Sequence, residues 1–237
     1  HLGDGSGRSC VLLLAPTDPT TSGMCLSRSM QHYSTGSLHQ QTRPHEFRAT
    51  VVNEEFMSYE PRQLPEEVQR LCAELDAPPR LVAHLTLVHD VAVDLCEGLR
   101  QKFHDLEFDE AAVCFGAGSH DIGKVEHPNE LTGPGRQHEE DGPALLKEHG
   151  VEPSLARFAR THGSWSHEEL QLEDLLVAIC DCIWKGERLG ELERIVISQI
   201  ATQTGDEEWE VFSELDDLLE KIGGQGDERL AWQRTNG

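Results

Sequence analysis

Positive charge is scarce in this chain. Its 237 residues include 20 lysines and arginines against 43 aspartates and glutamates, which gives a formal net charge of −23. Sequence-independent binding to a nucleic-acid backbone needs clustered lysine and arginine side chains. The composition therefore argues against a nucleic-acid duplex as a partner. It leaves room for a compact basic pocket, and the acidity favours solubility.

Long apolar runs are also missing. A membrane-spanning helix needs about 18 or more apolar residues in succession, and no run in the chain approaches this length. The run VLLLA at 11–15 is shorter than a signal-peptide core, which is usually about 7–15 residues. The sequence thus predicts no membrane segment and no secretory signal.

The cysteines lack the pattern of a disulfide framework. There are seven, an odd number, with no CxxC pair, and most lie in apolar stretches of helical period. Such cysteines are typical of reduced thiols in the core of a cytoplasmic protein. Cys180 and Cys182 have a spacing that metal sites sometimes use, but the spacing alone is weak evidence for one.

Alternating β-type patterns are absent, and helical periodicity takes their place from Pro61 onward. The sequence predicts an all-α bundle over 61–224. Residues 1–60 are rich in small and polar residues and are predicted to be a disordered or loosely attached segment, and 225–237 a flexible tail. Helices are expected near 64–77, 78–103, 109–124, 137–150, 152–162, 168–187, 189–200 and 206–224. The last of these is expected to bury a stripe formed by Trp209, Phe212, Leu215, Leu219 and Ile222.

Several histidines and aspartates occupy inward positions of these helices. On 78–103, His84 falls inside the apolar stripe and His89 at its edge. His120 and Asp121 end the apolar helix of 109–124, and Asp181 lies within LLVAICDCIW. An aspartate among apolar residues is costly to bury unless it is paired or binds a cation. Together these residues indicate a metal centre inside a helical bundle, although a single inward histidine is more often a hydrogen-bonded core residue than a ligand.

The order His, His-Asp, Asp, with the pair inside HDIGK at 120–124, resembles the HD-domain superfamily of metal-dependent phosphohydrolases. The resemblance covers about 79–190 and implies a helical fold. It implies that His84, His120, Asp121 and Asp181 are metal ligands, with His89 as the competing first histidine. The double histidine and GYP signature of the HD-GYP branch are missing, so the cyclic-dinucleotide activity of that branch is not implied.

Two further histidines resemble the extra ligands of members that hold two metals. His138 precedes a glycine by four residues in HEEDG, and His162 lies in ARTHGSW. The alternative is that both are helix-terminal histidines that act as caps or contact solvent. Mixed imidazole and carboxylate ligands suit Mn, Fe, Co, Ni or Zn. The expectation is therefore one or two such ions per chain.

The resemblance implies a phosphohydrolase that cleaves a phosphoester of a small molecule, a nucleotide being one candidate, by attack of a metal-activated water. Asp121 would bridge two ions and Lys124 would hold the substrate phosphate, although Lys124 also suits a helix C-terminus. Arg136, Arg160 and Lys185 are weaker phosphate-binding candidates, and Trp165 a weak candidate for stacking on a base. The competing interpretations are an inactive HD-type regulatory or scaffold protein and a helical binding module without metal.

Overall fold

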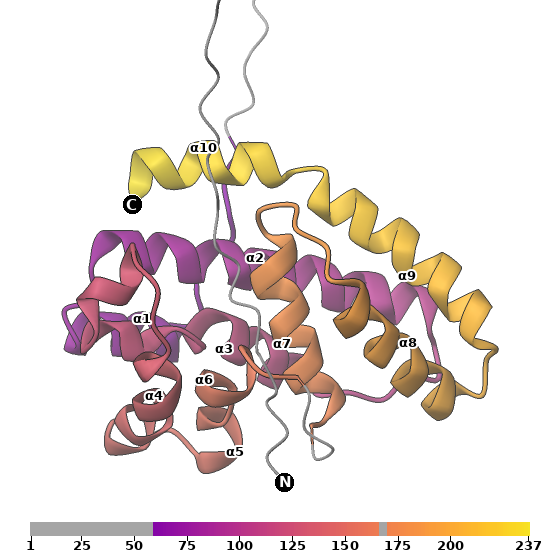
Figure 1. Cartoon of the computed structure of the whole chain (residues 1–237), viewed down its shortest axis with the longest axis horizontal. Helices are drawn as coiled ribbons and strands as arrows, with labels where there is room; N and C mark the ends of the chain where they lie inside the picture. Colours follow the sequence, from indigo (N-terminus) through magenta and orange to yellow (C-terminus); the bar gives the residue numbers. More distant parts are fainter. Residues whose placement is uncertain (1–58, 166–169) are drawn as a thin grey trace, which may run out of the picture. The chain divides into compact units, whose positions relative to one another are not determined.

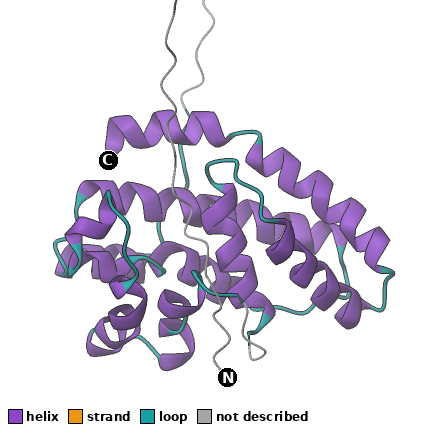
Figure 2. Cartoon of the chain, in the orientation of Figure 1, coloured by secondary structure: helices purple, strands orange, loops and turns teal. Residues whose placement is uncertain are grey.

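The computed structural model describes residues 59–165 and 170–237, and the predictions made for 1–58 lie outside this part of the chain. Ser58–Gly237 belong to one unit. Within the described residues there are helices and loops but no strands (Figure 2), so the all-α prediction is confirmed. The elements are α1 Glu66–Glu74, α2 Pro79–Lys102, α3 Glu110–Ser119, η1 Ile122–Val125, η2 Pro128–Leu131, α4 Gln137–Glu148, α5 Pro153–Ala156, α6 Phe158–Thr161, α7 Leu172–Ile183, α8 Gly190–Thr204, α9 Glu208–Gly223 and α10 Gly226–Asn236.

The long helix α2 is the centre of the bundle (Figure 1) and packs against α3, α7, α9 and α10. Its apolar residues from Leu87 to Leu99 contribute to the larger of two hydrophobic clusters. The helices α4, α5 and α6 pack together, and the short helix η1 lies against α4. No helix among the described residues is both long and apolar enough to cross a bilayer.

Local sequence explains where the main helices begin. Pro79 occupies the first turn of α2, where its missing N–H costs nothing. The Asp109 carboxylate caps α3 by accepting the N–H of Ala112 at 3.0 Å. Gln171 and Asp174 form a reciprocal capping box that starts α7. These signals fix the phase of the three helices that contribute His84, His120 and Asp181.

Residues 226–236 form helix α10 where the sequence predicted a flexible tail, and this corrects the boundary at 224. Arg229 of α10 is fully buried. Its guanidinium donates to the Ile222 carbonyl at 2.7 Å, to Gln225 Oε1 at 3.0 Å and to the Tyr59 hydroxyl at 3.3 Å. The segment has few apolar residues, so its helical period is weak, and a buried cation with these acceptors holds it to the bundle.

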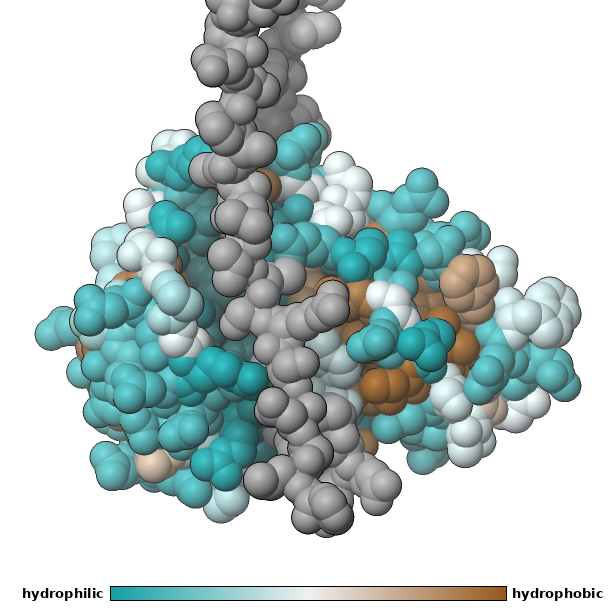
Figure 3. Space-filling view, in the orientation of Figure 1, coloured by the Kyte–Doolittle hydropathy of each residue, from teal (hydrophilic) through white to brown (hydrophobic). Residues whose placement is uncertain are grey.

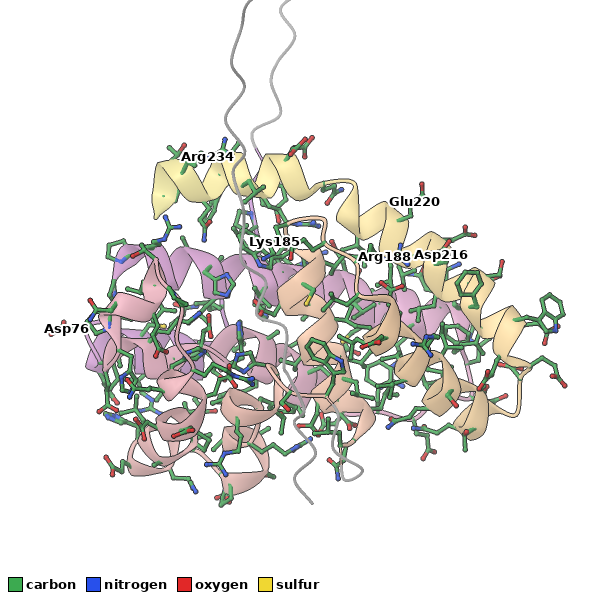
Figure 4. The ribbon with its side chains drawn as sticks, in the orientation of Figure 1. Asp76, Lys185, Arg188, Asp216, Glu220 and Arg234 are labelled. Atoms are coloured by element: carbon green, nitrogen blue, oxygen red, sulfur yellow. The ribbon has the colours of Figure 1, made fainter. Side chains whose placement is uncertain are left out.

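Helix α9 buries Leu215, Leu219 and Ile222 as predicted, but not the two aromatic residues of the predicted stripe. Trp209 and Phe212 are 68% and 53% exposed, whereas the buried residues are Val211, Leu215, Leu218, Leu219 and Ile222. The first two turns of the helix therefore present two aromatic side chains to solvent. Figure 3 shows apolar residues in the region of α7 and α8, against a largely hydrophilic surface elsewhere on this face. An ion pair joins α9 to the loop before α8. Arg188 of this loop pairs with Asp216 of α9 at 2.7 Å (Figure 4).

Candidate metal centre

Asp121 lies at the junction between α3 and η1, and its surroundings depend on two glycines. A Cβ at Gly123 would lie 2.4 Å from the backbone oxygen of His138, and a Cβ at Gly142 would lie 2.9 Å from the Cβ of Ala159. Both positions therefore need glycine for η1 and α6 to approach α4 this closely. The close packing places His138 beside Asp121 although 17 residues separate them in the chain.

The Oδ2 atom of Asp121 faces two histidines. His84 Nε2 lies 3.2 Å and His120 Nε2 3.6 Å from this oxygen. Asp181 completes the arrangement, because its Oδ1 lies 3.3 Å from the Nε2 atoms of both histidines. We call His84, His120, Asp121 and Asp181 the Oδ2 group. The helices α2 and α7 and the junction between α3 and η1 thus bring two imidazoles and two carboxylates to one point.

The Oδ1 atom of the same carboxylate faces two other histidines. His138 Nε2 lies 3.0 Å and His162 Nε2 3.5 Å from it. We call Asp121, His138 and His162 the Oδ1 group. In each of the two triads that share Asp121, potential ligand atoms lie within 4.8 Å of one another. One carboxylate therefore joins two adjacent sets of nitrogen ligands through its two oxygens.

The histidine rings are oriented for metal binding. The Nδ1 atom of His120 lies 2.9 Å from the Ala117 carbonyl oxygen, and that of His162 lies 3.1 Å from the Phe158 carbonyl oxygen. A carbonyl oxygen only accepts, so these Nδ1 atoms carry the proton. In the neutral form of these rings, the Nε2 atom that faces Asp121 is then free to bind a metal, which is the arrangement of metal-ligating histidines. The donor set fits a divalent ion such as Mn, Fe, Co, Ni or Zn.

The site is buried on one side and open on the other. His120, Asp121, His138 and His162 are at most 6% exposed, whereas the side chains of His84 and Asp181 are 15% and 31% exposed. Burial disfavours the charged form of Asp121, but the surrounding histidines outweigh burial and hold its pKa well below the ordinary value. The same competition lowers the pKa of Asp181. Both carboxylates are therefore anionic ligands at neutral pH.

Proton release provides a test of the Oδ2 group. Burial by itself would lower the pKa of His84. Hydrogen bonds to Asp121 and Asp181 outweigh burial and raise the pKa above its ordinary value, to about 9. At pH 7.5 His84 is protonated, and it must lose this proton to bind a metal. We expect about one proton to be released from this residue when the Oδ2 group binds its ion, and metal affinity to rise as pH approaches 9. Calorimetric titration in buffers of different ionisation enthalpy measures the release. Binding heats that do not depend on the buffer would contradict the expectation.

The structure brings together all six histidines and aspartates named from the sequence as metal ligands. His84, and not the alternative His89, contributes to the triads. Neither triad contains a cysteine, so the described residues give Cys180 and Cys182 no part in this centre. Lys124 donates its ammonium to Asp121 Oδ2. The predicted ligand set is thus one continuous cluster in the fold.

The weaker candidates have other contacts. Arg136 pairs with Glu139 at 2.6 Å and donates to the Gly163 carbonyl at 3.0 Å. Lys185, in the turn after α7 (Figure 4), pairs with Glu187 at 3.1 Å. Trp165 packs against the larger hydrophobic cluster, and Arg160 is exposed. No hydrogen bond or ion pair joins these four described residues to the two groups, although the charge of Asp181 contributes to the raised pKa of Lys185.

Two neighbours of the centre were missed by sequence reasoning. The Trp184 ring packs against the His84 ring, with centroids 5.2 Å apart. The Glu130 carboxylate lies 2.5 Å from Nδ1 of His138. A helical-phase argument identifies Trp184 only as a core residue. Nothing in the sequence distinguishes Glu130, because it lies in a loop eight residues before its partner.

Comparison with known proteins agrees with this geometry. The family model for the HD domain matches residues 81–183. This part of the chain is similar to the HD domain. The match begins in α2 and ends with α7, so it includes His84, the His120–Asp121 pair and Asp181. No curated protein and no solved structure matches the chain. The HD domain is found in a superfamily of metal-dependent hydrolases, and the clusters described above are ones that could hold the metal.

Proposed function

We propose that this HD domain is a metal-dependent phosphohydrolase that cleaves a phosphoester of a small molecule, a nucleotide being one candidate. The observation that supports the proposal most strongly is the division of the Asp121 carboxylate between two pairs of histidines. A carboxylate shared in this way suits two adjacent divalent ions, the arrangement that many phosphoester-cleaving enzymes use.

Each residue of the centre has a defined task in this proposal. A bound divalent ion supplies a water of pKa about 7 and polarises a phosphoryl oxygen. The Nε2 atoms of the four histidines would hold the ions, while Asp121 and Asp181 would supply negative charge. Substrate would enter on the side of His84 and Asp181, because these are the more exposed side chains of the centre.

Lys124 is a positively charged side chain in direct contact with the metal centre. Its ammonium donates to Asp121 Oδ2, and its side chain is 20% exposed. A metal ion on the same oxygen would place a second positive charge beside the ammonium, which is unfavourable unless an anion lies between them. A substrate phosphate is such an anion, so we assign Lys124 to holding a phosphoryl oxygen.

Replacing Lys124 with glutamine separates this role from metal binding. We expect turnover to fall about 10²-fold, the typical effect of losing one group that stabilises transition-state charge. Metal affinity should be unchanged or higher, because the substitution removes a competing cation from Asp121. Steady-state kinetics and calorimetric metal titration measure the two effects.

The matched control for Lys124 is Lys147→Gln, which removes an exposed lysine of α4 and should leave both quantities unchanged. Weaker metal binding by Lys124→Gln, in proportion to its lost activity, would show that the lysine supports the ligands and does not contact the substrate.

The function itself is tested by metal content and turnover on one preparation. Protein purified without chelator is analysed for Mn, Fe, Co, Ni and Zn by elemental mass spectrometry. It is then assayed against p-nitrophenyl phosphate, bis-p-nitrophenyl phosphate and nucleoside phosphates. One or two equivalents of metal with metal-dependent hydrolysis is the expected result. Bound metal without hydrolysis of any ester would favour the regulatory or scaffold alternative, and a chain that takes up no metal would refute both.

A further inference from the structure

Glu130 is a buried carboxylate outside the two ligand groups. It lies in η2, in the loop between Asp121 and His138, and its side chain is 8% exposed. Its Oε1 accepts the N–H of Gln137 at 3.1 Å and its Oε2 accepts the N–H of His138 at 3.2 Å. A Cβ at Gly135 would lie 2.2 Å from Glu130 Oε1, so the loop can enclose the carboxylate only with glycine at this position.

The position of His138 in its helix explains why this ring needs a partner from another element. His120 and His162 direct Nδ1 to the carbonyl oxygens of Ala117 and Phe158, three and four residues earlier. His138 is the second residue of α4, so no preceding helical turn can supply a carbonyl. Glu130 takes that role, with its Oε2 2.5 Å from His138 Nδ1.

A carboxylate partner also differs from a carbonyl in charge. It fixes the ring with Nδ1 protonated and Nε2 toward Asp121, and it makes the imidazole a stronger donor to a metal. We infer that Glu130 is a positioning residue that holds His138 as a ligand and thereby sets the affinity of the Oδ1 group for its ion. The inference rests on the proposed binding of metal at this centre. The Oδ2 group has no contact with Glu130 and should not depend on it.

The test is a titration of metal-stripped protein with Co²⁺, followed by calorimetry and by the visible absorption of the bound ion. We expect the wild type to take up two equivalents. The isosteric variant Glu130→Gln should bind the first equivalent normally and the second 10–100-fold more weakly, as when outer partners of metal-ligating histidines are lost. Glu126→Gln, an exposed change in the same loop, is the control and should match the wild type.

The stability of the metal-stripped Glu130→Gln variant distinguishes a positioning role for Glu130 from a purely structural one. The glutamine amide oxygen can take the place of Oε2 and still accept the N–H of His138, while the N–H of Gln137 loses its acceptor. The start of α4 should therefore persist, and the stripped variant should stay folded with only a small fall in its unfolding temperature. Wild-type affinity for both ions in Glu130→Gln would overturn the inference. Equal weakening of both equivalents would also overturn it. A wild-type chain that binds no Co²⁺ would instead refute the proposed function.

Discussion

The Asp121→Ala variant is expected to lose its bound metal and at least about 10³-fold in hydrolytic rate. Asp121 is the one ligand common to both groups, with Oδ2 toward His84 and His120 and Oδ1 toward His138 and His162. Its removal takes an anionic ligand from each position at once, and it leaves four imidazoles with less negative charge to balance a cation. Elemental mass spectrometry and ester hydrolysis measure the two losses on one preparation.

Two measurements keep this prediction specific. The far-ultraviolet circular dichroism of Asp121→Ala should retain its helical signal, because Asp121 lies at the end of α3 and not within a helix. The control Asp141→Ala removes a carboxylate from α4 that is 56% exposed and pairs with His127. This variant should keep both its metal and its activity. Retained turnover in Asp121→Ala would rule out the assignment of the centre.

The Arg229→Ala variant is expected to lose about 2–4 kcal/mol of unfolding free energy without losing metal. Arg229 is fully buried and holds α10 through three hydrogen bonds. Its acceptor Tyr59 in turn donates to Asp90, which Arg62 pairs at 2.8 Å. Truncation therefore removes the guanidinium donor from the Ile222 carbonyl and from Gln225, takes a cation out of a buried polar network and opens a cavity. Denaturant unfolding followed by circular dichroism measures the change.

The control for Arg229 is Arg234 on the same helix (Figure 4), which is exposed. Arg234→Ala should change the unfolding free energy by less than about 0.5 kcal/mol. If the two variants were equally stable, α10 would contribute nothing to the folded unit and the original prediction of a flexible tail would stand. Metal content in Arg229→Ala should match the wild type, because the residue contacts neither ligand group.

The sequence by itself determined the helical fold and the elements that contribute the metal ligands. Proline in the first turn of α2, the Asp109 cap of α3 and the apolar stripe around His84 are local signals. Local signals fix where a helix starts and which face is apolar. The placement of His120 and Asp121 at the end of α3 followed from the same reasoning.

Tertiary structure decided what depends on neighbours from distant parts of the chain. Which aromatic residues of α9 are buried depends on the helices against which it packs, and so Trp209 and Phe212 proved to be exposed. A polar segment such as α10 becomes an ordered helix only because its buried arginine finds acceptors outside its own turns. The division of Asp121 between two histidine pairs and the contact of Glu130 with His138 require loops and helices to meet in space. Helical periodicity carries no information on such meetings, because chain connectivity does not fix the distance between side chains of separate elements. The six ligands were named from the resemblance to the HD-domain superfamily, which did not indicate Glu130.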